Sequence, residues 1–385
     1  MKSVFVIDPG MMEAGGHHAA LLETLIETRQ NDVNLSVFGH IELDKELYAK
    51  SIDSGIVVYR HFKTNFYQHY EDSFYLKLSG IQTYIRLLAW EYSQALSYVA
   101  QQNESMDSIV CFYPCVNWEH ASALSLALAS ITNSPLLHHK VCCMFQPLKS
   151  SKEMDLYYKS AFRQLRKNSE VKLYASDWET KIYYDSLDLY IDDFHPCYLL
   201  PWHKLNVTKR QKPCTPNILA YFGDAKVNKG FCKLPELVER LLLAYERKIR
   251  ITIQFTMAWE NPALETAIRE LKSLARVYEE VILESRFWSA SEMVQKLNDT
   301  THIICTYEVN DYQHKSSGLA WLARFFSIPV VIGGECWLTR EFDRIGVNYA
   351  VSSELNDRTP SSIKNEREVK YKDALFDNIN HWLVV

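Results

Sequence analysis

Short hydrophobic segments alternate with amphipathic segments along most of the chain, and this alternation limits the possible folds more than any other feature. Hydrophobic runs of this length favour strands buried on both faces, whereas amphipathic stretches favour helices. In the first half we expect strands at residues 3–8, 34–38, 55–60, 108–113 and 171–175, with helices at 17–30, 81–102, 118–131 and 177–185. This pattern predicts a parallel sheet with helices on both faces.

The second half repeats the alternation more regularly. We expect strands at 218–222, 250–255, 281–283, 301–306 and 330–333, with helices at 231–246, 262–276, 289–297, 316–326 and 338–345. Ser289 is followed three residues later by Glu292, a capping-box pattern that marks the start of one of these helices. The predicted fold class is therefore α/β.

The length of the chain and the position of its prolines indicate two domains. At 385 residues the chain exceeds what one hydrophobic core usually supports. The segment 201–216 contains three prolines and four basic residues with little apolar periodicity, so it is the best linker candidate. We expect Rossmann-like domains at 1–203 and 217–365, joined by a linker at 204–216. Residues 366–385 end in an apolar stretch, and we expect them to form a helix that crosses back to the first domain.

Composition argues against several classes of protein. The net charge of −5 disfavours general nucleic-acid binding. The nine cysteines include no CxxC pair, so reduced thiols and no metal site are expected. No segment approaches the roughly 20 apolar residues of a membrane span, and residues 1–10 lack the apolar run of a signal peptide. We therefore expect a cytoplasmic protein.

The first candidate binding element is the turn at residues 8–18, where a strand is expected to end and a helix to begin. Gly15 and Gly16 allow a ligand to approach the backbone closely. His17 or His18 at the helix start has the chemistry to meet a phosphate or a sugar hydroxyl. The GxGxxG fingerprint is not matched, so a nicotinamide or flavin cofactor is disfavoured. A plain turn with a capping histidine is the alternative.

The second element is the loop at residues 223–231, again between a strand and a helix. Lys226 and Lys229 lie three residues apart in this glycine-flanked loop, and as point charges both can reach a diphosphate. The alternative is a pair of solvated surface lysines.

The third element is the segment 307–321, which leads from a hydrophobic strand into a helix. Exposed N–H groups and the positive end of the dipole make a helix start suited to phosphate. The candidates at this start are Lys315, Ser316, Ser317 and Gly318. Glu308 and Tyr312 lie nearby in sequence, where they can take sugar hydroxyls. The alternative is a serine-capped helix without a ligand.

Together the last two elements resemble the nucleotide-sugar half of GT-B glycosyltransferases, and the chain is most similar to glycosyltransferase family 4. Such proteins open their carboxyl-terminal domain with Gly-Asp-x-(Arg/Lys)-x-x-Lys-Gly-Phe, which stands here at 223–231. Related sequences carry a Tyr…Ser-Ser-Gly helix start and a Gly-x-Pro-Val-Val strand, similar to 312–318 and 327–331 here. The Gly-Gly-His-His at 15–18 looks like the acceptor-side glycine loop of the family. The likeness is good across 218–350 and weak between the first turn and the linker.

The resemblance implies two Rossmann-like domains facing a central cleft, and a retaining, metal-independent hexosyltransferase without a cofactor besides its nucleotide-sugar co-substrate. It implies transfer to a glycan or lipid-linked saccharide, as in bacterial capsule or lipopolysaccharide synthesis. The implied donor-binding residues are Gly16, Gly223, Asp224, Lys226, Lys229, Glu284, Tyr312, Lys315, Ser316, Ser317 and Gly318. The implied acceptor-binding residues are His17, Glu119 and His120. The implied catalytic residues are His18, Lys229 and Glu308.

Lipid-linked acceptors lie at the inner membrane, so a basic helical face would fit peripheral membrane contact. Arg163, Arg166 and Lys167 have helical spacing within 159–172. A solvated helix is the favoured alternative, because surface amphipathic helices are common.

One departure concerns two glutamates that many family members place at a fixed spacing around the glycine. Aligned on Gly318, these positions fall near Lys315 and Ala323, so the glutamate that would hold the ribose is missing. Glu308 and Glu284 are candidate substitutes. Two alternatives therefore stay open: a non-hydrolysing nucleotide-sugar epimerase of similar architecture, and a non-catalytic nucleotide-sugar-binding relative.

Overall fold

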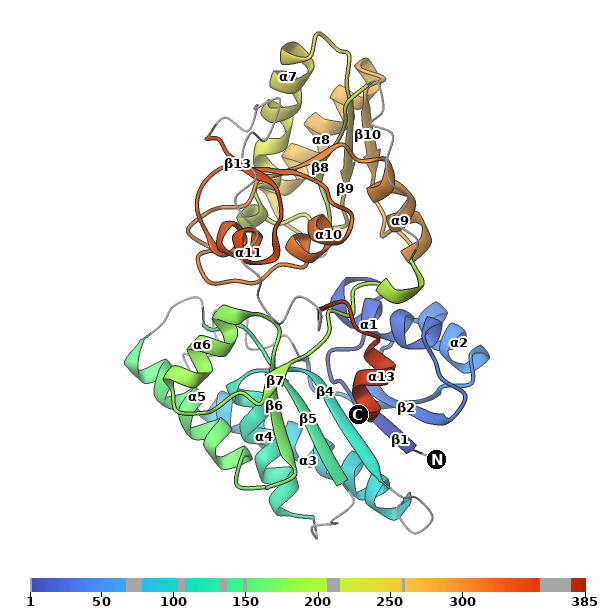
Figure 1. Cartoon of the computed structure of the whole chain (residues 1–385), viewed down its shortest axis with the longest axis vertical. Helices are drawn as coiled ribbons and strands as arrows, with labels where there is room; N and C mark the ends of the chain where they lie inside the picture. Colours follow the sequence, from blue (N-terminus) through green and yellow to red (C-terminus); the bar gives the residue numbers. More distant parts are fainter. Residues whose placement is uncertain are drawn as a thin grey trace. The chain divides into compact units, whose positions relative to one another are not determined.

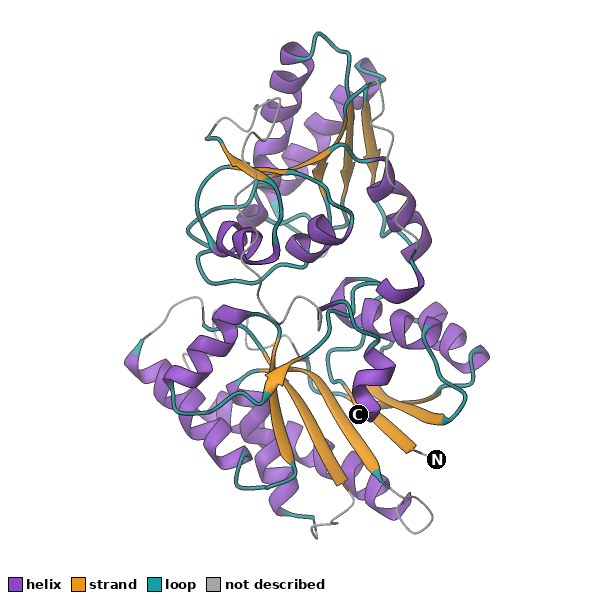
Figure 2. Cartoon of the chain, viewed as in Figure 1, coloured by secondary structure: helices purple, strands orange, loops and turns teal. Residues whose placement is uncertain are grey.

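The computed structural model describes residues 2–66, 78–102, 108–131, 137–147, 151–205, 215–257, 260–353 and 375–385. The chain forms two compact units: unit 1 is Met1–Lys204 with Asp373–Val385, and unit 2 is Leu205–Lys372 (Figure 1). Each unit combines its own parallel sheet with helices (Figure 2). The α/β class predicted from the alternation is confirmed.

Unit 1 contains a seven-stranded parallel sheet in the order β3-β2-β1-β4-β5-β6-β7. Its strands are β1 (Lys2–Ile7), β2 (Val33–His40), β3 (Val57–Phe62), β4 (Ile109–Val116), β5 (Leu137–Cys143), β6 (Val171–Ala175) and β7 (Asp193–Phe194). Five consecutive residues of β1 are buried, which requires cover on both faces of the sheet.

The helices of unit 1 cover this sheet. They are α1 (Gly16–Glu27), α2 (Lys45–Asp53), α3 (Leu78–Gln101), α4 (Trp118–Ala129), α5 (Lys152–Leu165), α6 (Trp178–Ser186), the short η4 (Trp202–Lys204) and α13 (Ile379–Val384). Apolar side chains of α1, α2 and α13 share one core cluster with β1 and β2, as Leu25, Leu47 and Leu383 illustrate.

Helix α13 comes from the end of the chain and packs into the core of unit 1. Ile379 and Leu383 are buried there, and the amide of Asn380 donates to the Thr28 hydroxyl at 2.5 Å. The Trp382 ring meets Tyr174 edge-on, with ring centroids 4.7 Å apart. These contacts anchor the last residues on unit 1, although residues 354–374 lie outside the described part of the chain.

Unit 2 contains a six-stranded parallel sheet in the order β10-β9-β8-β11-β12-β13. Its strands are β8 (Asn217–Tyr221), β9 (Arg250–Gln254), β10 (Val281–Glu284), β11 (His302–Cys305), β12 (Val330–Ile332) and β13 (Tyr349–Val351). Its helices are η5 (Val227–Lys229), η6 (Phe231–Lys233), α7 (Leu234–Ala244), α8 (Pro262–Val277), α9 (Ala290–Asp299), α10 (Leu319–Phe325) and α11 (Trp337–Ile345). The capping box predicted from Ser289 and Glu292 is confirmed at the start of α9.

The strand order reverses once in each sheet. In unit 1, β2 and β3 are added on one side of β1, and β4 and the later strands are added on its other side. In unit 2, β9 and β10 lie on one side of β8, and β11 to β13 lie on the other. Ligands of open α/β sheets bind outside the carboxyl ends of strands at such reversal points. The loops after β1 and β4, and those after β8 and β11, are therefore the candidate binding loops.

Several boundaries differ from the sequence-based expectation. Helix α10 begins at Leu319 rather than at 316, with Gly318 as its N-cap. Ser317 lies before the helix, where its hydroxyl accepts from Leu319 N–H and its carbonyl from Ala320 N–H. The expected basic helix over 159–172 ends at Leu165, and Lys172 lies in β6. Short or polar elements were not predicted, namely α2, β5, β7 and β13.

Candidate functional site

The loop after β8 is held by side chains from neighbouring strands. Gly223 has a φ of +102°, a conformation that favours glycine, and its N–H donates to Gln254 Oε1 at 2.8 Å. The Thr256 hydroxyl donates to Asp224 Oδ1 at 2.8 Å. The Tyr221 hydroxyl donates to the carbonyl of Asp224 at 2.6 Å. The course of the loop is therefore set by β8 and β9 before any ligand binds.

The far end of the same loop rests on the residues after β11. Gly230 adopts a φ of +71°, and a Cβ atom there would lie 2.0 Å from the Thr306 carbonyl oxygen. The Thr306 hydroxyl donates to the carbonyl of Lys229 at 2.7 Å, and Glu308 N–H donates to the carbonyl of Asn228 at 2.9 Å. The second and third sequence elements are thus held together at the reversal point of the sheet.

Three lysines gather where these two segments meet. Lys229 Nζ lies 6.0 Å from the centroid of Tyr307, and Lys315 Nζ lies 5.5 Å from that of Tyr312. Burial and the charge of Lys226 lower the pKa of Lys229 to about 8, and Lys315 adds to the same effect. Burial and the charge of Lys226 also lower the pKa of Lys315. The ammonium groups therefore repel one another, and an anion placed among them would relieve this repulsion.

Carboxylates offset part of this positive charge. Asp224 Oδ2 lies 3.4 Å from Lys226 Nζ. Asp224 also favours the charged form of Lys229, and Asp311 favours that of Lys315. Three lysine side chains from two segments make this a place suited to a small, multiply charged anion.

The aromatic and hydroxyl candidates of the third element support this site from one side. The rings of Tyr307 and Tyr312 lie 4.3 Å apart, and Tyr312 is only 2% exposed, so its ring serves mainly as packing. The hydroxyls of Tyr307 and Ser317 lie 3.3 Å apart. Ser316, Ser317 and Gly318 form the entry to a seven-residue helix rather than its first turn.

Both glutamates considered as substitutes for the missing family glutamate already have cationic partners. Glu308 Oε1 lies 2.7 Å from Lys233 Nζ. Glu284, at the end of β10, accepts from Lys296 and from the Trp288 indole. Burial opposes ionisation of Glu284, yet these hydrogen bonds hold its pKa below the usual range. Glu308 and Glu284 both lie in unit 2, as the donor candidates do, but each carboxylate is already paired with a lysine.

One residue of the site was missed by the sequence analysis. Gln254 is 1% exposed, and its amide joins two loops, accepting from Gly223 N–H and donating to the Arg286 carbonyl at 2.5 Å. A buried amide at the carboxyl end of a strand was the signal that could have revealed it.

In unit 1, the turn after β1 builds a buried carboxylate–imidazole pair. His18 Nδ1 donates to Asp8 Oδ2 at 2.7 Å, and Gly10 N–H donates to Asp8 Oδ1 at 3.0 Å. A Cβ at Gly10 would lie 2.5 Å from the His18 ring, so only glycine allows this approach. The His17 ring lies 4.0 Å from the His18 ring. A φ of +77° at Gly16 explains the glycine that begins α1.

The other acceptor candidates lie deep in unit 1. Glu119 and His120, on the first turn of α4, are fully buried. His120 Nε2 lies 2.9 Å from the Tyr84 hydroxyl, and its ring stacks on Phe66 at 4.4 Å. Phe66 also meets His18 edge-on at 5.2 Å, so one aromatic ring links the residues after β1 and β4.

Two of the three basic side chains expected on a membrane-facing helix, Arg163 and Arg166, have acidic partners. Lys159 and Arg163 pair with Asp188, and Arg166 pairs with Asp192. Within the described residues, no helix is long and apolar enough to span a membrane. The same residues contain no cluster of three or more His, Cys, Asp or Glu side chains able to hold a metal ion.

Solved structures resemble this chain over most of its length. A lipopolysaccharide outer core galactosyltransferase, WaaB, matches with a TM-score of 0.52 at 14% identity, covering 92% of this chain and 87% of the other. A UDP-GlcNAc 2-epimerase from Methanocaldococcus jannaschii matches with a TM-score of 0.54 at 9% identity, covering 100% and 99%. The chain has the GT-B fold. The S. aureus MnaA–UDP complex also matches, with a TM-score of 0.54 at 11% identity and coverage of 92% and 86%.

These similarities establish the GT-B fold and nothing finer. No family model matches the sequence, and no curated protein matches it. Membership of glycosyltransferase family 4 therefore stays a prediction. The GT-B structures that resemble this chain include both glycosyltransferases and nucleotide-sugar epimerases, so the choice between them depends on chemistry.

Proposed function

We propose that this protein is a glycosyltransferase that moves a sugar from a nucleotide-sugar donor to a saccharide or lipid-linked saccharide. The observation that carries the proposal is the cluster of Lys226, Lys229 and Lys315 beside the reversal point of the unit 2 sheet. Two segments distant in sequence converge there, and their charges call for an anion such as a diphosphate.

The reaction explains why cations belong at this place. As the bond between the anomeric carbon and the diphosphate oxygen breaks, its electron pair moves onto the diphosphate. Fixed ammonium groups stabilise this developing charge more in the transition state than in the bound donor. The lysines supply the kind of charge stabilisation that a metal ion supplies in other diphosphate sites. The donor-side candidates of unit 2, including Gly223, Asp224 and Tyr312, frame this cluster.

The acceptor belongs to unit 1 in this proposal. Asp8 Oδ2 accepts a hydrogen bond from His18 Nδ1, so in the neutral imidazole Nε2 is the acceptor atom of the ring. This tautomer is the one able to accept a hydrogen bond from a sugar hydroxyl. We assign His17, Glu119 and His120 to the surroundings of that hydroxyl, with His120 connected to His18 through the ring of Phe66.

Finer features of the proposal come from the family resemblance. They are retention at the anomeric carbon, a hexosyl donor, and an acceptor of the capsule or lipopolysaccharide type at the cytoplasmic face of the inner membrane. Fold alone does not fix such features. The similarity to the outer core galactosyltransferase is compatible with them.

An epimerase is the second candidate. Its support is the similarity to the Methanocaldococcus jannaschii UDP-GlcNAc 2-epimerase, which covers 99% of that chain. An epimerase would hold the same diphosphate without needing an acceptor. The missing family glutamate keeps a third candidate, a non-catalytic binder, in view.

Incubation with a panel of UDP-, GDP-, ADP- and dTDP-sugars separates these functions. Nucleoside diphosphate released only when a saccharide acceptor is present supports transfer. Formation of an isomerised donor in the absence of any acceptor would show that the protein is an epimerase and not a transferase. Saturable binding of the donor with neither product would leave a binding protein.

A further inference from the structure

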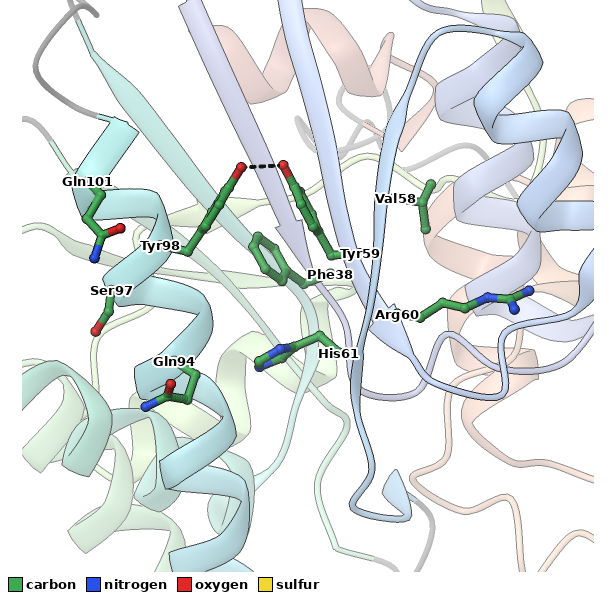
Figure 3. A pocket seen from close by; sticks show the side chains of 9 residues that line it. All are labelled: Phe38, Val58, Tyr59, Arg60, His61, Gln94, Ser97, Tyr98 and Gln101. Atoms are coloured by element: carbon green, nitrogen blue, oxygen red, sulfur yellow. Dashed lines mark hydrogen bonds between the residues drawn. The ribbon is translucent and has the colours of Figure 1, made fainter.

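A pocket of about 610 Å³ lies in unit 1 between strand β3 and helix α3 (Figure 3). Its volume falls within the roughly 300–1,000 Å³ of small-molecule sites. Its lining residues are Phe38, Val58, Tyr59, Arg60, His61, Gln94, Ser97, Tyr98 and Gln101. None of these residues belongs to the Asp8–His18 pair or to the surroundings of His120.

Aromatic rings form the floor of this pocket. Phe38 and Tyr59 stack at 4.6 Å with an interplanar angle of 18°, and the Tyr59 and Tyr98 rings lie 5.0 Å apart. The two tyrosine hydroxyls point toward each other at 2.6 Å (Figure 3). A hydrogen bond between two hydroxyls uses one donor of the pair, so one O–H and several lone pairs remain for a ligand.

One face of α3 supplies further neutral polar groups. Gln94, Ser97 and Gln101 follow helical spacing, which places them on the same face. All three are exposed, and their side chains form no hydrogen bond with other described residues. Amide and hydroxyl groups both donate and accept, as do sugar hydroxyls.

The basic side chains of the lining, Arg60 and His61, bind other groups of the protein. The guanidinium of Arg60 donates to the Leu43 carbonyl at 3.0 Å and lies 4.2 Å from the Tyr48 ring centroid. His61 Nε2 donates to the Glu91 carbonyl at 2.8 Å. No acidic side chain lines the pocket. The groups left for a ligand are therefore neutral, which argues against a phosphate or a nucleotide and for a neutral, hydroxyl-rich molecule.

The pocket also lies at a suitable place for a long acceptor. Strand β3 is the edge strand, two positions from β1 in the sheet order, so about 10 Å separates it from the strand that leads to Asp8. Phe38 is in register with Tyr59 on one side and with Ile7, the last residue of β1, on the other. The rings therefore lie level with the end of β1 and beside it.

We propose that this pocket is a saccharide subsite that holds a distal sugar of the acceptor chain. Sugar rings present apolar C–H faces and hydroxyl edges, which match the aromatic floor and the amide–hydroxyl rim. The role as an acceptor subsite rests on the proposed transferase function, whereas binding of a neutral saccharide does not.

Binding is tested without any donor. Saturation-transfer NMR of the full chain with maltohexaose, cellohexaose and chitohexaose should detect binding of at least one. The double variant Gln94→Ala/Gln101→Ala and, separately, Tyr98→Ala should weaken it by about 10-fold or more, as expected for losing paired polar groups or a ring anchor. Gln82→Ala is the matched control, since Gln82 is an exposed amide on the same helix outside the pocket.

Three outcomes would overturn the subsite: no hexasaccharide binds the native protein, the pocket variants bind as well as the native protein, or Gln82→Ala loses binding equally. A change of fold is excluded by confirming that each variant keeps the circular dichroism spectrum and the urea midpoint of the native protein. If only Tyr98→Ala fails this control, the double variant Gln94→Ala/Gln101→Ala tests the subsite.

Kinetics then separate the subsite from the transferase proposal. In the pocket variants, KM for a long acceptor should rise by about 10-fold with unchanged kcat, while KM for a monosaccharide acceptor stays constant. Transfer with equal KM values in native and variant proteins would overturn the acceptor role. Saccharide binding without transfer to any acceptor would instead refute the transferase and leave a saccharide site.

Discussion

The Cβ position of Gly230 lies 2.0 Å from the carbonyl oxygen of Thr306. The backbone of the lysine loop and the backbone after β11 thus meet at a point where only glycine fits. The Thr306 hydroxyl strengthens this contact through its bond to the Lys229 carbonyl. Lys229 is therefore presented by a loop that is fixed at both of its ends, at Gly223 and at Gly230.

Substitution of this glycine should disturb the fold of unit 2. Gly230→Ala combines a strained left-handed backbone, about 1–2 kcal/mol, with a backbone clash of about 1–3 kcal/mol. We expect the urea midpoint to fall clearly. Gly16→Ala is the control, because Gly16 has a φ of +77° but nothing within 4 Å of its Cβ position. Equal losses in both variants would show that the contact with Thr306 contributes nothing.

Removal of the Lys229 ammonium group should lower kcat more than it weakens acceptor binding. We expect Lys229→Ala to lower kcat by about 100-fold or more, as when an electrostatic stabiliser of the transition state is removed. Steady-state kinetics with the best donor of the panel measure the loss. Lys248→Ala is the control, since Lys248 is a highly exposed lysine of the same unit. Native kinetics in a folded Lys229→Ala protein would remove this residue from the site.

Diphosphate binding should take up a proton at mildly alkaline pH. The pKa of Lys229 is lowered to about 8 by burial and by Lys226, so part of the population is neutral above pH 8. A bound diphosphate favours the ammonium form and raises this pKa, so affinity falls as pH rises through 8. Calorimetry of uridine diphosphate binding at pH 8.5, in buffers of different ionisation enthalpy, measures the uptake. Binding that releases protons, or exchanges none, would contradict the site.

The same pKa shift has the opposite consequence for the unliganded fold. Between about pH 8 and the unfolded value of 10.5, the unfolded chain binds more protons at Lys229 than the folded chain does. The contribution of this group to stability therefore increases with pH across that window. Lys229→Met should flatten this part of the stability profile in urea titrations.

The buried Asp8–His18 pair predicts a defect specific to the acceptor. In Asp8→Asn the charge that fixes the imidazole tautomer is lost, and we expect kcat to fall by about 100-fold, the lower end of acid–base contributions. Affinity for uridine diphosphate, measured by calorimetry, should not change, because Asp8 lies in unit 1. Asp32→Asn, an exposed carboxylate of the same unit, serves as the control. A uniform loss of donor binding would show a fold defect instead.

The hydroxyl pair of the β3–α3 pocket should be visible in a tyrosine titration. Burial, and then the hydrogen bond and charge of Tyr98, raise the pKa of Tyr59 to about 12. Tyr98→Phe removes the second and third causes, so the pKa of Tyr59 should move down toward 10 without reaching it. NMR of ring-labelled tyrosine measures this shift, and Tyr190→Phe, at a strongly exposed tyrosine, should leave it unchanged. An unmoved Tyr59 would mean that the hydroxyls do not interact in solution.

Periodicity alone predicted the two parallel sheets and most of their helices, because a strand covered on both faces must be apolar at every position. Elements without such a run of apolar residues were not predicted. β5 carries two histidines and a lysine, and its burial comes from its central place in the sheet rather than from its composition. Short elements such as α2 and β13 gain their stability from packing, which leaves little trace in a window of sequence.

For the candidate site, the amino-acid sequence shows which residues are available: the glycines that permit the turns, and the lysines and histidines that follow strands. The three-dimensional arrangement establishes which of these residues lie close together. It brought Lys315 within electrostatic range of Lys226 and Lys229, and it paired His18 with Asp8. It also places a lysine beside each of Glu308 and Glu284. Glu119 is fully buried in unit 1. Charge interactions and burial depend on distances through space. Strand order and backbone contacts set these distances between segments that lie far apart in the chain.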